Sequence, residues 1–310
     1  MSRNLVLQRV TPRPKFSSRL LVASLVALGV VVPLVTTSAS AASAKKASGA
    51  VDVLYAGSLL DLMQQQLGPA FQKATGYTVS GFSAGSTALA SEIKGGTEVG
   101  DVFISASSSV NATLQGASNG NWVSSYSEFG FSRLVLGYNP KSKFAKLLRT
   151  KSWYNVVDMP GFLLGRTDPV TDPKGVLVVD ALEGVALSHN LPALNPLATS
   201  TSNIFAETAL VGELQAGQLD AGFFYGVEAA AAQLTTVPLK GTDLSGQYTV
   251  AILNRAPHAA AARAFVKFLL SAAGQSILRK NGVTPMIPPK VTRASSATTT
   301  SSIAPTTTTS

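Results

Sequence analysis

Cysteine is absent from the 310 residues of the chain, and histidine occurs only twice. The lack of cysteine excludes disulfide bonds, thiolate metal sites and attachment of a lipid to a cysteine behind a leader. Charged residues make up only 13% of the chain and hydrophobic residues 45%, so apolar side chains suffice for a core of ordinary size. The sequence therefore predicts a fold that its hydrophobic core stabilises.

Acidic residues are missing from positions 1–50, and this segment carries seven of the formal +9 charges. The rest of the chain is nearly neutral, at about +2. Binding to nucleic acid needs basic residues clustered on the folded domain, so we exclude nucleic acid as a partner. The basic residues of the segment are Arg3, Arg9, Arg13, Lys15, Arg19, Lys45 and Lys46.

An apolar run from Leu20 to Leu34 follows the basic stretch and precedes a segment of small residues. This order is typical of a secretory signal peptide, which we place at residues 1–44. The run is shorter than the ~20 residues of a membrane-spanning helix. We therefore predict a secreted protein of the periplasmic or cell-wall space, with an uncleaved leader that anchors it to the membrane as the alternative.

Apolar strands and helix-spaced apolar residues alternate between residues 51 and 290. Residues 51–106 read as strand, helix, strand, helix and strand, which predicts a parallel sheet with helices on both faces. Residues 131–138 form a further strand that leads into a second lobe. Residues 291–310 are mostly Ser, Thr and Ala and are predicted to be a disordered tail. The later strands are predicted at 162–164, 221–225 and 248–253, and the later helices at 176–187, 207–216, 260–270 and 275–278.

Glycine-serine pairs occur at two of the predicted strand-to-helix turns, Gly57-Ser58 and Gly85-Ser86. Such turns lie at the carboxyl ends of strands, where free N–H groups of a helix can bind an anion. Capping of the helix is the alternative role of each serine. The residues from Asp172 to Gly175 lead into a third helix in the same way. Together these turns indicate a cradle for an anion.

The segment Gly81-Phe82-Ser83-Ala84-Gly85 has the G-x-S-x-G form of a hydrolase nucleophile elbow. Asp220 and His258 follow in the order that a triad with Ser83 requires. The motif is short, however, and no His-Gly-Gly-Gly oxyanion motif accompanies it. A secreted serine hydrolase remains the alternative from another functional class.

Three further candidates each have an ordinary structural explanation. Asp168 lies in an Asp-Pro turn, Glu207 begins a helix whose dipole favours an acid, and Tyr225 ends an apolar strand of the core. The spacing of these residues does not decide between structural roles and ligand binding.

Several segments between residues 51 and 288, read together, resemble the molybdate/tungstate-binding proteins of ABC importers, in particular the branch known from archaeal tungstate uptake. The segments are Ala56-Gly57-Ser58-Leu59, Ala84-Gly85-Ser86, Gly100-Asp101-Val102, Gly165-Arg166-Thr167-Asp168-Pro169 with Asp172-Pro173, Gly217-Gln218-Leu219-Asp220, and Ala264-Phe265-Val266-Lys267-Phe268-Leu269-Leu270.

The resemblance implies an α/β fold of the type II periplasmic-binding-protein class, in which two lobes with mainly parallel sheets close about a hinge over a tetrahedral dianion. It also implies that Asp168 and Glu207 approach the metal centre of that dianion. Val176 and Leu177 replace more polar residues of the family, so any contact there would come from backbone N–H groups. The remaining contact residues that the resemblance implies are Gly57, Ser58, Ser86, Gly175 and Tyr225.

Carboxylates beside a dianion repel it unless they bind its metal. Molybdenum(VI) and tungsten(VI) can expand from four to six oxygen ligands, whereas the sulfur of sulfate and the phosphorus of phosphate do not do so readily. Hard oxygen ligands suit such hard centres. On this hypothesis Asp168 and Glu207 select molybdate and tungstate against sulfate.

We therefore expect a monomeric binding protein without catalytic residues or cofactor, which delivers molybdate or tungstate to a membrane permease and its ATPase. Residues 51–133 and 240–290 would form lobe 1, and residues 134–239 lobe 2. A binder of another oxyanion, or of ferric iron, on the same fold is the alternative within this class.

Overall fold

The computed structural model describes residues 48–294. The predicted signal peptide and residues 295–310 of the predicted tail lie outside this part of the chain. Within residues 48–294, no helix has both the length and the apolar character needed to cross a membrane.

The first sheet has the strand order β2, β1, β3, β9 and β4, with β10 on the other edge of β4. The pairs β1–β2 and β1–β3 are parallel, whereas β9 runs antiparallel to both β3 and β4. These strands are β1 (Ala50–Ala56), β2 (Thr78–Ala84), β3 (Val102–Ser105), β4 (Val123–Tyr138), β9 (Ser245–Leu253) and β10 (Thr284–Arg293).

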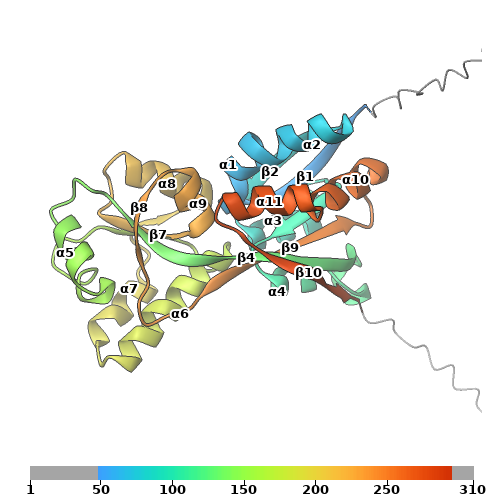
Figure 1. Cartoon of the computed structure of the whole chain (residues 1–310). Helices are drawn as coiled ribbons and strands as arrows, with labels where there is room; N and C mark the ends of the chain where they lie inside the picture. The colour runs from blue at the N-terminus through green and yellow to red at the C-terminus, as the bar shows by residue number, and fades with distance from the viewer. Residues whose placement is uncertain (1–47, 295–310) are drawn as a thin grey trace, which may run out of the picture. The chain divides into compact units, whose positions relative to one another are not determined.

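Helices cover both faces of the first sheet because successive side chains of a strand point to opposite faces. In β1, Val53 and Tyr55 belong to the main core together with Phe71 of α2, while Leu54 packs in a second cluster with Leu89 of α3. Figure 1 shows α2, α10 and α11 together beside β1 and β2. The helical segments here are η1 (Gly57–Leu59), α1 (Leu60–Leu62), η2 (Met63–Leu67), α2 (Gly68–Thr75), α3 (Ser86–Gly95), α4 (Ser108–Ala112), η3 (Ala117–Asn119), α10 (Ala259–Leu269) and α11 (Ala272–Lys280).

The second sheet contains the end of β4 followed by β7, β5 and β6, and β8 pairs with β4. Phe223 of β7 packs with Leu182 of α6 in the main core, and the next residue, Phe224, packs with Leu210 of α8 in a third cluster. The elements are α5 (Ala145–Thr150), η4 (Trp153–Asn155), β5 (Leu164–Thr167), α6 (Pro173–Ser188), η5 (Pro192–Leu194), α7 (Asn195–Thr199), β6 (Ile204–Phe205), α8 (Glu207–Gln215), β7 (Ala221–Tyr225), α9 (Gly226–Ala231) and β8 (Thr235–Pro238).

Strand β4 belongs to both sheets, as Figure 1 shows. Its residues from Val123 to Arg133 pair with β9, and those from Leu134 to Tyr138 pair with β7. A single strand of 16 residues thus connects the two halves of the fold. Any motion of one half against the other has to bend or twist this strand.

The alternating order predicted from the sequence is confirmed, but the sheets are mixed and not mainly parallel. Strands β4 and β9 lie between two groups of parallel strands, β2-β1-β3 and β6-β5-β7. Both run antiparallel to their neighbours. Strand β10 was not predicted, since its prolines hide the strand pattern. It takes in residues 291–293, which the sequence assigned to a disordered tail and which pair with Ser125–Ser127 of β4.

Helix α6 offers a matched test of the core. Leu182 is fully buried, whereas Leu187 on the same helix is 87% exposed. We expect Leu182→Ala to lower the free energy of unfolding by about 2–5 kcal/mol, because it leaves a cavity, and Leu187→Ala to change it by less than about 0.5 kcal/mol. Urea denaturation of both variants measures this, and equal losses would contradict the assigned packing of α6.

Candidate functional site

The carboxyl ends of four strands contribute to one cluster of polar side chains. Strand β1 ends before Gly57-Ser58, β5 ends before the loop that contains Asp172, β6 is followed by Glu207, and β7 ends at Tyr225. Ligands of open α/β sheets bind at these ends, where loops lead into helices. The cluster therefore lies where the fold is expected to hold a ligand.

Two glycines allow the loops of the two sheets to approach each other. A Cβ atom on Gly57 would lie 2.8 Å from Oε2 of Glu207, and one on Gly85 would lie 2.4 Å from the carbonyl oxygen of Thr171. The backbone N–H of Ala88, in the first turn of α3, donates to that same carbonyl over 3.1 Å. Larger residues at positions 57 and 85 would push these loops apart.

The hydroxyls of Ser58 and Ser86 are buried, and neither caps its helix. Oγ of Ser58 lies 2.9 Å from the hydroxyl of Tyr248 in β9. Oγ of Ser86 accepts a hydrogen bond of 3.1 Å from the backbone N–H of Ala106, which leaves its own proton free to be donated. The alternative of simple capping is therefore wrong for both serines.

Asp172 and Glu207 carry buried carboxylate oxygens whose hydrogen bonding is incomplete among the described residues. Oδ1 of Asp172 caps α6 by accepting from the backbone N–H of Lys174, over 2.9 Å, but its Oδ2 accepts no hydrogen bond of normal geometry, although the hydroxyl of Thr167 is near enough to lower the pKa. Neither oxygen of Glu207 accepts a hydrogen bond of normal geometry, although the backbone N–H of Gly57 is near enough to lower its pKa and Nζ of Lys174 lies 3.6 Å from Oε1. Buried polar atoms are normally satisfied, so incompletely satisfied ones at the end of a sheet are candidates for ligand binding.

Lys174 provides the positive charge of the cluster and is fully buried. Its Nζ donates to Oε1 of Glu228 over 2.6 Å and lies 3.6 Å from Oε1 of Glu207. Oε2 of Glu228 in turn accepts from the backbone N–H of Tyr225 over 2.8 Å. Glu228 thus fixes the ammonium group beside Glu207.

Three buried carboxylates share this one ammonium group. Burial raises the pKa of Glu207 far above its ordinary value, and the nearby charge of Asp172 raises it further. Burial also raises the pKa values of Asp172 and Glu228, although Lys174 opposes the shift in both. For Lys174, burial lowers the pKa, but the charges of Glu228 and Glu207 outweigh it and hold the pKa above its ordinary value. An excess of negative charge therefore stays inside the cluster unless a proton or a ligand compensates it.

Tyr225 and Tyr248 close the cluster on the side of β7 and β9. Their ring centroids lie 6.1 Å apart in an edge-to-face arrangement. Burial raises the pKa of both phenols well above the ordinary value. The hydroxyl of Tyr225 has no partner among the described residues, so it is free to bind a ligand as a neutral phenol.

A pocket of about 200 Å³ opens beside the cluster. Ser58, Glu207 and Glu228 line it together with Gly57, Asp61 and Thr208. The side chain of Glu207 is itself fully buried, so a solute in the pocket reaches its oxygens only after neighbouring side chains move.

The structure brings together Gly57, Ser58, Glu207 and Tyr225 of the residues predicted from the sequence, and the Gly85-Ser86 turn lies beside Asp172, since a Cβ atom on Gly85 would lie 3.2 Å from Cβ of Asp172. Asp168 is not part of this cluster. Oδ1 of Asp168 accepts from the backbone N–H of Val170 over 2.9 Å in a turn, and the residue is partly exposed. The second acid of the same motif, Asp172, contributes the buried carboxylate. The prediction chose the first Asp-Pro pair because the sequence does not show which of the two faces inward.

Residues 175–177 act through packing in this structure. A Cβ atom on Gly175 would lie 2.5 Å from the backbone N of Pro169, so glycine is needed for the loop to fold back on α6. The side chain of Val176 is 44% exposed, and Leu177 packs against the main core. Neither of these two side chains belongs to the cluster.

Lys174, Glu228 and Tyr248 were not predicted as site residues. Charged residues in helices are normally exposed, so nothing in the sequence marks Lys174 or Glu228 as buried. The one local pattern near Lys174 is the Asp172-Pro173 pair, which has the form of an N-cap followed by proline at the first position of a helix.

The proposed hydrolase triad is not assembled. Asp220 accepts hydrogen bonds from Ser142 and from the backbone of Leu163. His258 contacts Asp101 near the amino ends of β1 and β3, whereas Ser83 lies near the carboxyl end of β2 and pairs with Tyr55. Residues 81–84 of the G-x-S-x-G segment thus belong to strand β2, and Gly85 is the N-cap of α3.

Two relatives are similar in sequence to a large part of this chain. An uncharacterized solute-binding protein of Halobacterium salinarum is 29% identical over 83% of this chain and 90% of its own length. The molybdate/tungstate-binding protein WtpA of Pyrococcus abyssi is 26% identical over 54% of this chain and 64% of its own length.

Solved structures of periplasmic binding proteins share the fold. The periplasmic molybdate-binding protein of Azotobacter vinelandii superposes with a TM-score of 0.59 at 20% identity, over 76% of this chain and 98% of that protein. The described chain thus has the α/β fold of periplasmic binding proteins. Residues 51–284 match the family described as bacterial extracellular solute-binding protein, and the chain belongs to that family.

Proposed function

We propose that this protein captures molybdate or tungstate outside the cytoplasm, after export by its signal peptide, and delivers it to the permease of an ABC importer. The observation that carries the proposal is the pair of buried carboxylates, Asp172 and Glu207, whose incompletely hydrogen-bonded oxygens lie at the carboxyl ends of the strands. The similarity to the molybdate/tungstate-binding protein WtpA supports the choice of solute.

The charges of the cluster favour an oxyanion that contains an expandable metal centre. A sulfate ion can offer only oxygens, which repel ionised carboxylates, and a hydrogen phosphate ion can donate its proton to one carboxylate but still faces the other with its oxygens. Molybdenum(VI) and tungsten(VI) accept further hard oxygen ligands, which Asp172 and Glu207 can supply. Lys174 and the hydroxyls of Ser58, Ser86 and Tyr225 can then donate to the oxygens of the anion.

Ferric iron fits the same cluster less well. The buried ammonium group of Lys174 lies inside the cluster and repels a bare cation, whereas it attracts an oxyanion. The neutral phenols of Tyr225 and Tyr248 are suited to donate hydrogen bonds to an oxyanion.

Delivery requires that the ligand be enclosed and later released. The two halves of the fold both contribute to the cluster, with Ser58 and Tyr248 on the first sheet and Glu207 and Tyr225 on the second. Strand β4, which both sheets share, is the element about which they can rotate. Closure on the bound oxyanion would form the surface that the permease recognises.

The ligand specificity can be tested with three variants in calorimetry. We expect Asp172→Asn and Glu207→Gln each to weaken binding of molybdate and tungstate at least tenfold, about 1.4 kcal/mol, because each removes an anionic oxygen ligand. Asp168→Asn is the matched control and should change affinity less than about twofold. Sulfate, phosphate and ferric citrate should give no heat of binding with the wild type.

Two outcomes would overturn this assignment. One is the absence of binding to both molybdate and tungstate. The other is a larger loss of affinity in Asp168→Asn than in Asp172→Asn. This result would show that Asp168, and not Asp172, contacts the metal.

The ligand-free protein should lose stability as the pH rises. Folded Glu207 keeps a proton above the ordinary carboxyl pKa of 4.5, while the unfolded chain releases it. The free energy of unfolding therefore falls with rising pH from about 4.5 until the folded pKa is passed, by up to about 1.4 kcal/mol per pH unit. The amide of the Glu207→Gln variant does not ionise. The free energy of unfolding of this variant, relative to that of the wild type, should therefore increase over this range.

Urea denaturation without ligand between pH 4.5 and 8 measures this difference. Glu183→Gln, an exposed position on α6, is the control for the substitution itself. A difference between Glu207→Gln and the wild type that stays constant with pH would show that Glu207 is ionised in the folded protein.

A further inference from the structure

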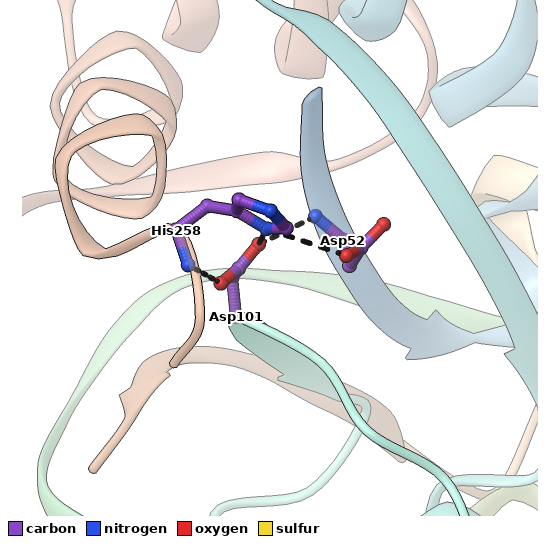
Figure 2. A group of neighbouring side chains, drawn as sticks. All are labelled: Asp52, Asp101 and His258. Carbon is purple, nitrogen blue, oxygen red and sulfur yellow. Dashed lines mark hydrogen bonds and ion pairs between the residues drawn. The ribbon is translucent and has the colours of Figure 1, made fainter. Parts of the chain in front are cut away.

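A second polar cluster lies at the amino ends of β1 and β3. The carboxylate cluster lies at the opposite, carboxyl ends of the strands. It consists of Asp52 in β1, Asp101 before β3 and His258 at the N-cap of α10. Figure 2 shows the three side chains pointing toward one another from three separate segments. None of them takes part in the proposed function.

The candidate ligand atoms lie close together. Nδ1 of His258 is 3.0 Å from Oδ2 of Asp101 and 3.4 Å from Oδ2 of Asp52. All three atoms lie within 4.8 Å of one another. In a tetrahedral site with metal–ligand bonds of about 2.0–2.1 Å, neighbouring ligand atoms are about 3.4 Å apart. Small shifts of Asp52 and His258 would therefore place all three around one ion.

Asp101 is held in place independently of the two other side chains. It is fully buried, and its carboxylate accepts hydrogen bonds from the backbone N–H groups of Asp52, over 2.8 Å, and of His258, over 2.6 Å. Such hydrogen bonds from outside the ligand set orient a carboxylate that binds a metal. Asp101 cannot move away from Asp52, so the two negative charges are kept near each other.

The composition and exposure of the cluster fit a divalent cation. One neutral imidazole and two carboxylates suit a first-row transition ion, whose double positive charge balances the two negative ones. The side chains of Asp52 and His258 are 35% and 51% exposed, which leaves room for water as a further ligand. Entry from solvent is open on the same side.

We propose that Asp52, Asp101 and His258 bind one divalent transition-metal cation, separately from the oxyanion site. The ion would join the start of β1, the start of β3 and the N-terminus of α10, which are far apart in the sequence. Because binding favours the folded state over the unfolded one, the ion would stabilise the first sheet. Direct contact of His258 with the two acids, without a metal, is the competing account.

Zinc chloride is the probe, titrated into the chain purified without a polyhistidine tag and freed of metal with a chelator. We expect calorimetry to show one zinc bound per chain and the melting temperature to rise with zinc. His258→Gln and Asp52→Asn should each weaken zinc binding at least tenfold and abolish the rise. His189→Gln, which alters the other histidine of the chain, is the matched control and should behave as the wild type.

The melting temperature of His258→Gln without metal shows whether the variant is folded. Absence of saturable zinc binding to the wild type would overturn the proposal and favour direct contact of His258 with the two acids. Zinc binding that His258→Gln and Asp52→Asn leave unchanged would overturn it as well. Molybdate affinity measured with and without zinc is expected to be equal, so this proposal and the proposed function can fail separately.

Discussion

Three buried carboxylates around one buried ammonium group form the interaction on which the site depends. Lys174 binds Glu228 directly and lies beside Glu207, so its charge neutralises only part of the negative charge of the cluster. Buried ion pairs are costly to leave unbalanced. The remaining negative charge therefore has to be compensated by a proton or by a ligand. In the proposed function, the metal centre of molybdate or tungstate provides this compensation.

The way in which the two sheets meet keeps these charges together. Gly57 and Gly85 allow the loops of the first sheet to touch Glu207 and the Thr171 carbonyl of the second. The shared strand β4 connects the two sheets through one continuous backbone. Ligand binding and the relative position of the sheets are thus physically coupled, because the same loops carry both. This coupling is what a protein that must capture and later release a solute needs.

The opposite ends of the first sheet have contrasting chemistry. At the carboxyl ends, hydroxyls and an ammonium group accompany the acids, and this mixture suits an anion with a metal centre. At the amino ends, Asp52, Asp101 and His258 offer only acids and one imidazole, which suits a cation. The separation follows from the direction of the strands. The carboxyl ends of β1 and β2 lead into η1 and α3, whereas the amino ends of β1 and β3 meet the N-terminus of α10, which follows the antiparallel strand β9.

The sequence by itself determined the order of strands and helices, because hydrophobic periodicity and glycines at turns are local signals. It also indicated Ser58, Ser86, Glu207 and Tyr225 as candidates, through strand ends and a family resemblance. Tertiary structure alone decided that Asp172 faces inward and Asp168 outward, since both acids have the same local pattern. It also decided the burial of Lys174 and Glu228, the mixed sheets and strand β10. Each of these depends on pairing between segments distant in the chain, which no local pattern of residues records.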